Sequence, residues 1–184
     1  MPRSIVLDAS AALSVLRDEP SASRVITVLR DHIDSGGQVF VPSHFWLELA
    51  NVLVRRYGHT ANEVIERVRV LDEFELQSVD LDRTLWLLGV QRAADRTLSA
   101  YDAVYLAAAE VLEADLLTLD AQLAAAAGAR AIRLGPHRLG EVSAPYGNSA
   151  TVAAPAYADG ASPNEVLGKF GEYVAELRRQ ALAG

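Results

Sequence analysis

Four acidic residues stand where the chain is expected to leave a strand or to enter a helix. Asp8 and Asp120 each follow a short apolar run, whereas Glu48 and Asp102 lie in the first turns of expected helices. Each acid alone has an ordinary explanation: an aspartate can cap a helix, the stretch around Asp102 matches a capping box, and Glu48 could be an exposed helix position. Their shared placement, rather than any one of them, indicates a reactive site.

Carboxylates that converge from distant parts of a chain repel each other unless a cation lies between them. Mg²⁺ and Mn²⁺ prefer oxygen ligands, and such an ion can activate a water for attack on phosphorus and stabilise the leaving oxygen. The sequence has no cysteine, and its four histidines are widely spaced, so thiolate catalysis and zinc–thiolate sites are excluded. The acids therefore predict phosphodiester hydrolysis with Mg²⁺ or Mn²⁺ in preference to zinc proteolysis.

The apolar pattern alternates short β-type runs with longer helical stretches, and this predicts an α/β fold. Specifically, we expect a three-layer α/β/α sandwich with a central parallel sheet of about five strands. In such sheets ligands bind at the carboxyl ends of the strands, where strand order reverses, so the acids are expected to meet there. The expected strands are 4–7, 38–41, 76–79, 115–118 and 131–134; the expected helices are 10–17, 21–35, 44–57, 61–74, 82–97 and 100–113, with a short helix after Asp120.

The chain of 184 residues is expected to hold one main domain, residues 1–140, followed by a linker and a C-terminal amphipathic helix within 141–184. No apolar run is long enough for a membrane span or a signal peptide, and the expected location is the cytoplasm. The net charge of −7 does not exclude a nucleic-acid partner, because 16 of the 17 basic residues are arginine, which grips phosphates well.

Four segments of the sequence, taken in order, resemble the PIN-domain nucleases, and among them the VapC toxins of type II toxin–antitoxin systems. The resemblance covers roughly residues 3–135, and the chain departs from it in the stretch beyond Gly140. The segments are Val6-Leu-Asp-Ala-Ser10, Glu48-Leu-Ala-Asn-Val-Leu53, Leu98-Ser-Ala-Tyr-Asp-Ala-Val-Tyr-Leu-Ala-Ala-Ala109 and Leu117-Thr-Leu-Asp120.

This resemblance implies an endoribonuclease that cuts structured RNA (tRNA or rRNA) and thereby inhibits translation. It also implies Mg²⁺ or Mn²⁺ as cofactor, a homodimer, and a VapB-type antitoxin whose tail occupies the active-site groove. The family's most regular metal ligands correspond to Asp8, Glu48 and Asp102, and its more variable fourth position corresponds to Asp120.

Five further residues are expected to assist the site. By the resemblance, Ser10 and Thr118 support the acids or a water, although turn and cap chemistry explains them equally well. Asn51 lies one helical turn beyond the glutamate and is expected to hydrogen-bond the carboxylates, with an ordinary surface position as the alternative. Arg92 and Arg96, also one turn apart, are candidate contacts to RNA phosphates, with a solvated helix face as the alternative.

Other enzymes that place an aspartate after their first strand fit less well. A phosphatase of the haloacid dehalogenase kind needs a second aspartate two residues later, where this chain has Ser10. A phospho-receiver domain needs a lysine near the acids, and the only lysine is Lys169. The serine-hydrolase and P-loop motifs are absent. The remaining alternative is a catalytically silent module of the PIN fold that binds RNA or a protein.

Overall fold

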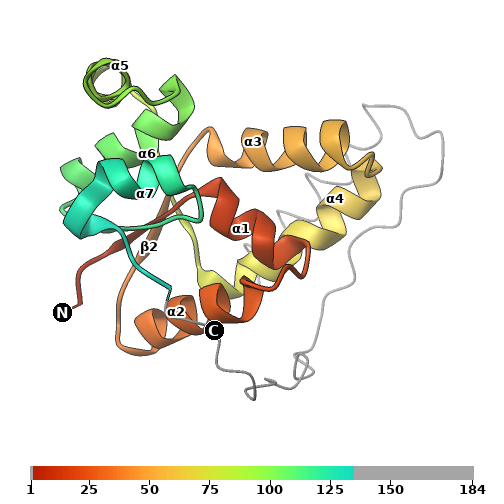
Figure 1. Ribbon diagram of the computed structural model, residues 1–184. Coiled ribbons are helices and arrows are strands. Elements are labelled where there is room, and N and C mark those ends of the chain that lie inside the picture. The colour runs from red at the N-terminus through yellow and green to blue at the C-terminus, as the bar shows by residue number, and fades with distance from the viewer. Residues whose placement is uncertain (1, 135–184) are drawn as a thin grey trace, which may run out of the picture.

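A parallel sheet forms the centre of the computed structural model, which describes residues 2–134 (Figure 1). Its strands follow the order β3-β2-β1-β4, and every pairing is parallel. The fifth expected strand is reduced to a single parallel bridge between Ala131 and Leu116, just after a 3-10 turn, so the described sheet has one strand fewer than predicted. The strands are β1 (Ile5–Leu7), β2 (Val39–Pro42), β3 (Gln77–Val79) and β4 (Asp115–Leu117).

Helices occupy every connection between the strands, as the periodicity predicts. Two of the expected helices change character near their ends: α3 continues as a π-helical turn and α4 as a 3-10 helix. The elements are α1 (Ala9–Leu16), α2 (Ala22–Asp34), α3 (Phe45–Asn51), η1 (Val52–Arg56), α4 (Ala61–Val68), η2 (Arg69–Phe74), α5 (Arg83–Arg96), α6 (Ala100–Val111), α7 (Ala121–Ala127) and η3 (Gly128–Arg130).

The helices cover both faces of the sheet. Parallel strands are joined by right-handed crossovers, so the reversal of strand order after β3 moves the later helices to the opposite face from the earlier ones. Helix α6 contacts β1, β2 and β4 and carries α5 on its outer side, while α1 contacts α2 and α3. The three-layer α/β/α architecture expected from the sequence is confirmed.

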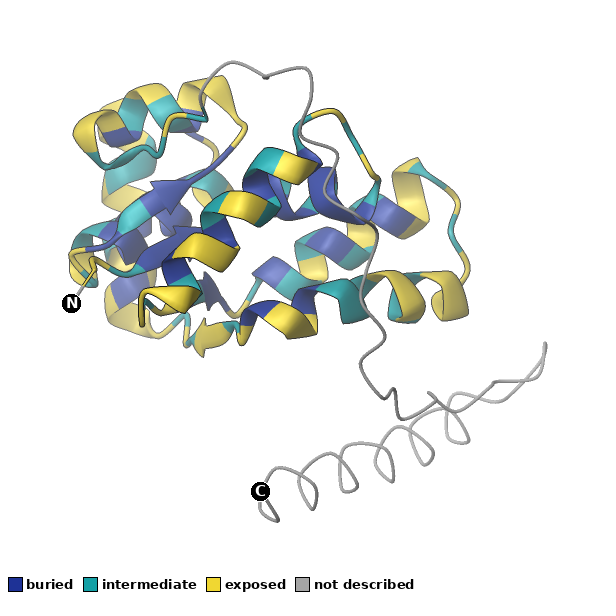
Figure 2. Ribbon diagram, turned by 90° about the horizontal axis from the view of Figure 1, so that it is seen from below, coloured by how far each residue is buried: buried dark blue, intermediate teal, exposed yellow. Residues whose placement is uncertain are grey.

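Strand β1 and helix α6 form the centre of the core, and Figure 2 shows how buried and exposed residues alternate along the helices. All three residues of β1 are buried, and α6 is buried continuously from Ala103 to Ala109. Helix α5 can approach α6 closely because a glycine faces it. A Cβ atom on Gly89 would lie 2.9 Å from Cγ2 of Val104. The close packing of these two helices fixes the position of the α6 N-terminus, where Asp102 lies.

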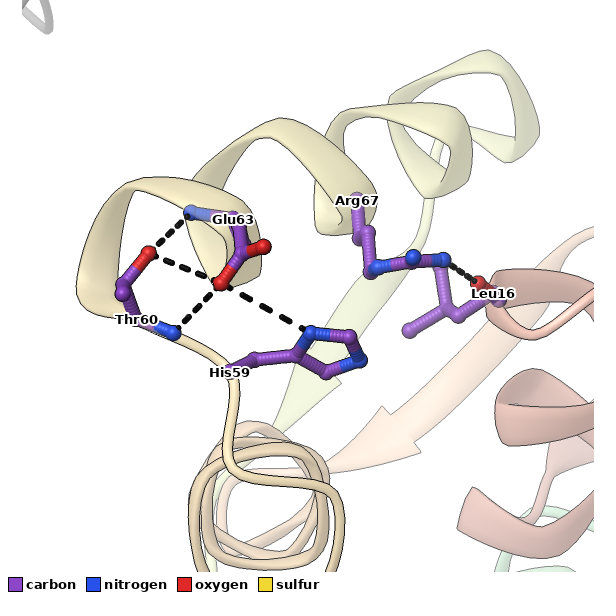
Figure 3. A network of polar contacts seen from close by, with 5 residues as sticks. All are labelled: Leu16, His59, Thr60, Glu63 and Arg67. Carbon is purple, nitrogen blue, oxygen red and sulfur yellow. Dashed lines mark hydrogen bonds and ion pairs between the residues drawn. The ribbon is translucent and has the colours of Figure 1, made fainter.

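Helix α4 has no buried residue and is held by polar contacts at both ends (Figure 3). At its start, Thr60 and Glu63 form a complete capping box, which satisfies two backbone N–H groups. Farther along, Nη1 of Arg67 donates to the carbonyl of Leu16 at 2.8 Å. This bond ties α4 to the C-terminal end of α1.

The predicted linker and C-terminal helix at 141–184, together with the last residues of the 1–140 domain, lie outside the described residues. Within residues 2–134, none of the helices combines the length and the apolar character needed to cross a bilayer.

Candidate active site

The order of the strands reverses between β1 and β4, and two of the four acids follow these strands. The chain moves outward from β1 through β2 to β3 and then returns to the other side of β1 to form β4. Asp8 directly follows β1, and its backbone N–H donates to the carbonyl of Leu117 at 3.0 Å. Asp120 lies three residues beyond β4. This edge is where open α/β sheets bind their ligands.

Asp8 is almost completely buried, with 3% of its surface exposed. It caps α1, and its Oδ2 accepts hydrogen bonds from Oγ1 of Thr118 at 2.7 Å, from the backbone N–H of Ser10 at 3.2 Å and from the Ser10 hydroxyl. Burial raises the pKa of Asp8, and these hydrogen bonds oppose the rise; the negative charge of Asp102 adds to it. A buried carboxylate beside another carboxylate is a charge that lacks a counterion.

Glu48 reaches the same region from the first turn of α3. Its side chain is partly buried, and Oε2 accepts a hydrogen bond from the Tyr105 hydroxyl at 2.9 Å. Burial raises the pKa of Glu48, and the charges of Asp8 and Asp102 raise it further, whereas the hydrogen bond from Tyr105 lowers it. Three acidic side chains, one just after β1, one in α3 and one in α6, therefore repel each other at one edge of the sheet.

Asp102 is held at the N-terminus of α6 by the residue that caps this helix. Oγ of Ser99 accepts the backbone N–H of Asp102 at 3.1 Å and donates to Oδ2 of the same aspartate at 2.6 Å. The cap thus does two things, since it starts the helix and fixes the carboxylate. Asp102 is therefore part of the helix cap that the sequence predicts, and its charge also acts on the other two acids.

Asp120 differs from the other three acids. It is exposed, and its Oδ1 accepts the backbone N–H of Leu123 at 2.7 Å, so it caps α7. Its backbone N–H donates to Oγ1 of Thr118 at 3.0 Å, which links it to the network around Asp8. It does not contribute to the raised pKa of Asp8 or of Glu48. The structure therefore brings three of the four acids into mutual electrostatic contact and leaves the fourth at the rim.

The five assisting residues are distributed unevenly around the acids. Ser10 and Thr118 hold Asp8, as described, and Oγ of Ser10 also accepts the backbone N–H of Leu119 at 3.0 Å. Asn51 is exposed at the end of α3 and makes no hydrogen bond to an acid of residues 2–134.

The two arginines of α5 have different surroundings. Nε of Arg92 donates to Glu110 at 2.7 Å, and its Nη1 lies 3.5 Å from Asp95. The bond to Glu110 raises the pKa of Arg92. Arg96 is exposed in the last turn of α5 and forms no ion pair within the described part of the chain. Of the two, Arg96 has the guanidinium that can turn to a new partner.

Sequence reasoning missed two aromatic residues behind the acids. Tyr105 is completely buried and donates to Glu48. The ring of His44 lies edge-on to Tyr105 with the centroids 4.9 Å apart, and 6.1 Å from the ring of Tyr101. Spacing gave a usable signal, because Tyr105 lies three residues after Asp102 and so shares its face of the helix. Burial lowers the pKa of His44, which makes this side chain a weaker source of positive charge beside the acids.

The donors at this edge suit Mg²⁺ or Mn²⁺ in kind. All are oxygen atoms, two of the carboxylates have raised pKa values, and the arginine ion pairs seen in residues 2–134 are made with other acids. Hard divalent cations prefer such oxygen ligands. Among residues 2–134, however, no three acid or histidine side chains are grouped closely enough to hold an ion in their present positions. The donor chemistry thus fits the ion, whereas the spacing of these side chains in the described residues does not yet form a metal site.

The fold is similar to that of several solved structures. They include the sarcin-ricin loop cleaving toxin VapC20 of Mycobacterium tuberculosis, with 16% identity, a TM-score of 0.54 and coverage of 67% of this chain and 95% of that one. PAE2754 from Pyrobaculum aerophilum has 20% identity and a TM-score of 0.52, covering 72% and 91%. A chain of a toxin–antitoxin complex from Klebsiella pneumoniae has 16% identity and a TM-score of 0.49, covering 64% and 87%. At these identities the similarity shows the fold alone.

No curated protein sequence matches the chain. The family model of the PIN domain, in contrast, matches residues 5–129. This range contains the whole sheet, the helices that cover it and all four acids. The chain therefore belongs to the PIN domain family.

Proposed function

We propose that this chain is an endoribonuclease of the VapC toxin type that depends on Mg²⁺ or Mn²⁺ and cleaves structured RNA. One observation carries the proposal: Asp8, Glu48 and Asp102 come from separate parts of the chain, and the charges of Asp8 and Asp102 act on Glu48 at the reversal of strand order. Bringing these negative charges together destabilises the folded chain. A site that binds a cation and a phosphodiester explains why the chain nevertheless places three acids there.

In this proposal the three carboxylates hold the ion, and Asp120 assists from the rim. A bound Mg²⁺ or Mn²⁺ supplies an activated water and neutralises charge on the phosphate. To hold an ion, the three carboxylates would have to approach one another, since no three such side chains of residues 2–134 form a metal group as they stand. Ser10 and Thr118 keep Asp8 in place while this occurs, because their hydroxyls bind Oδ2 and leave Oδ1 without a donor from the described residues.

Cleavage of a defined RNA by single-site variants tests the proposal. A sarcin-ricin loop hairpin is a suitable first substrate because a toxin of similar fold cleaves that loop. Asp8→Asn, Glu48→Gln and Asp102→Asn should each abolish cleavage, while chelation should abolish it in the wild type. The matched control is Asp115→Asn, an acid at the opposite end of β4, which should keep full activity. Cleavage that survives in Asp8→Asn would contradict the mechanism.

The finer parts of the proposal concern targets and partners. We propose tRNA or rRNA as the substrate, inhibition of translation as the effect, a VapB-type antitoxin and a second copy of the chain as partners, and the cytoplasm as the location. Exposed apolar side chains on α3 and α5, namely Leu47, Trp86, Leu87 and Val90, support a protein partner. Sequencing the RNA ends that appear after brief expression identifies the target, and light scattering gives the oligomeric state.

The second candidate is a silent PIN-fold module, which is favoured by the spacing of the acids, since no three described side chains form a metal group as they stand. Calorimetric titration separates the two candidates. A working site should bind Mn²⁺ in a manner that depends on Asp8, whereas a silent module should show no binding that Asp8→Asn removes.

A further inference from the structure

Tyr105 joins the two helices that carry Glu48 and Asp102. It projects from α6 one turn after Asp102, it is completely buried, and its hydroxyl donates to Oε2 of Glu48 at 2.9 Å. The ring of His44 packs edge-on against it. Burial and the neighbouring charges of Glu48 and Asp8 raise the pKa of Tyr105, so the phenol keeps its proton and acts as a donor toward Glu48.

The three central acids share one feature, since a protein donor occupies one oxygen of each carboxylate. In Asp8 it is Oδ2, bound by Thr118 at 2.7 Å; in Asp102 it is Oδ2, bound by Ser99 at 2.6 Å. In Glu48 it is Oε2. No residue within 2–134 donates to the second oxygen of any of the three. Each acid therefore has one oxygen that the protein holds and one that accepts no hydrogen bond from the described residues.

This pattern favours one class of ion over another. Ca²⁺ takes about six to eight oxygen ligands and commonly binds a carboxylate through both oxygens, whereas Mg²⁺ demands octahedral geometry and takes single oxygens. Mn²⁺ accepts the same oxygen ligands as Mg²⁺. A glutamate has a longer side chain than an aspartate and more freedom to swing into two-oxygen binding. Of the three hydrogen-bond donors, we therefore expect the Tyr105 hydroxyl, which bonds Glu48, to have the largest effect on which ion the site prefers.

We propose that Tyr105 is a positioning residue that reserves one oxygen of Glu48 and leaves only the other free, so that the site would favour Mg²⁺ or Mn²⁺ over Ca²⁺. This inference rests on the proposed function and deepens it. Tyr105 acts through Glu48 and touches neither the ion nor the RNA.

The test is Tyr105→Phe, which keeps the buried ring and removes only the hydroxyl. The matched control is Tyr101→Phe on the same helix, because the Tyr101 side chain is 67% exposed and its hydroxyl has no partner in the described structure. Dissociation constants for Mn²⁺ and for Ca²⁺ are measured by calorimetry on the full chain. In Tyr105→Phe, Mn²⁺ binding should weaken about 10-fold and Ca²⁺ binding by much less, so the preference for Mn²⁺ falls. Tyr101→Phe should match the wild type.

A merely structural role for Tyr105 gives a different result, in which thermal stability falls while the ratio of the two dissociation constants stays at the wild-type value. That result overturns the inference, and so does an equal weakening for both ions.

A double-mutant cycle supplies a second measurement. In a Glu48→Gln background, Tyr105→Phe should change Mn²⁺ affinity no further, and an undiminished effect overturns the inference. A wild-type chain that binds no Mn²⁺ refutes the proposed function as well, whereas Mn²⁺-dependent RNA cleavage with an unchanged ratio in Tyr105→Phe refutes this inference alone.

Discussion

Asp8→Asn removes a buried negative charge and keeps an oxygen that can accept the hydrogen bonds of Thr118 and Ser10. Burial raises the pKa of Asp8 in the folded, metal-free chain. An acid whose folded pKa exceeds its unfolded pKa destabilises the folded state once the pH passes the unfolded value. The free energy of unfolding of the wild type should therefore fall as the pH rises through the interval between those two pKa values.

The size of this effect follows from linkage. Within that interval the wild type loses about 1.4 kcal/mol of stability per pH unit from this one group. Asparagine does not titrate, so the stability of the variant relative to the wild type should rise by that amount per pH unit and then level off. Removing the charge of Asp8 also takes away one cause of the raised pKa of Glu48. This change likewise increases the stability of the variant relative to the wild type as the pH rises.

Urea unfolding with a chelator present, followed by the fluorescence of Trp46 and Trp86, measures this difference between pH 4 and pH 8. Asp115→Asn is the control, since this acid is partly exposed and pairs with Arg3 at 3.5 Å. Its stability relative to the wild type should not grow with pH as that of Asp8→Asn does. Parallel curves for Asp8→Asn and the wild type would refute the argument from burial.

Mn²⁺ should stabilise Asp8→Asn much less than it stabilises the wild type. At a concentration 100 times its dissociation constant, Mn²⁺ should add about 2.7 kcal/mol to the free energy of unfolding of the wild type. In Asp8→Asn this gain should shrink to a small fraction. An equal gain in both proteins would show that Mn²⁺ binds elsewhere on the chain.

Three further predictions concern the scaffold and the RNA. Gly89→Ala should lower the free energy of unfolding by about 1 kcal/mol in urea titrations, because the overlap with Val104 outweighs the gain in helix propensity; unchanged stability would contradict the close α5–α6 contact. Thr60→Ala should cost about 1 kcal/mol, seen as faster amide exchange within α4. Arg96→Ala should weaken RNA binding and reduce its salt dependence by about one charge, and Arg92→Ala, whose guanidinium pairs with an acid, should do so less.

Some of the site could be predicted because it depends on strand ends. A residue that directly follows a buried parallel strand lies at the carboxyl edge of the sheet whatever the neighbouring side chains are, which is why Asp8 and Asp120 were expected there. Helix starts are similarly local, since Ser99 caps α6 through atoms only three residues apart. The sheet order is not local, and the reduction of the fifth strand to one bridge at Ala131 shows how little a short apolar run says about pairing.

The amino-acid sequence by itself determined the alternation of strands and helices and the positions of the acids along the chain, because periodicity and capping act over a few residues. Only the tertiary structure decided which acids face one another. Glu48 and Tyr105 lie 57 positions apart and meet because α3 and α6 pack near the same edge, while Asp120 turns outward to cap α7. Such contacts depend on how helices are placed against the sheet, and that placement is set by the packing of the whole core.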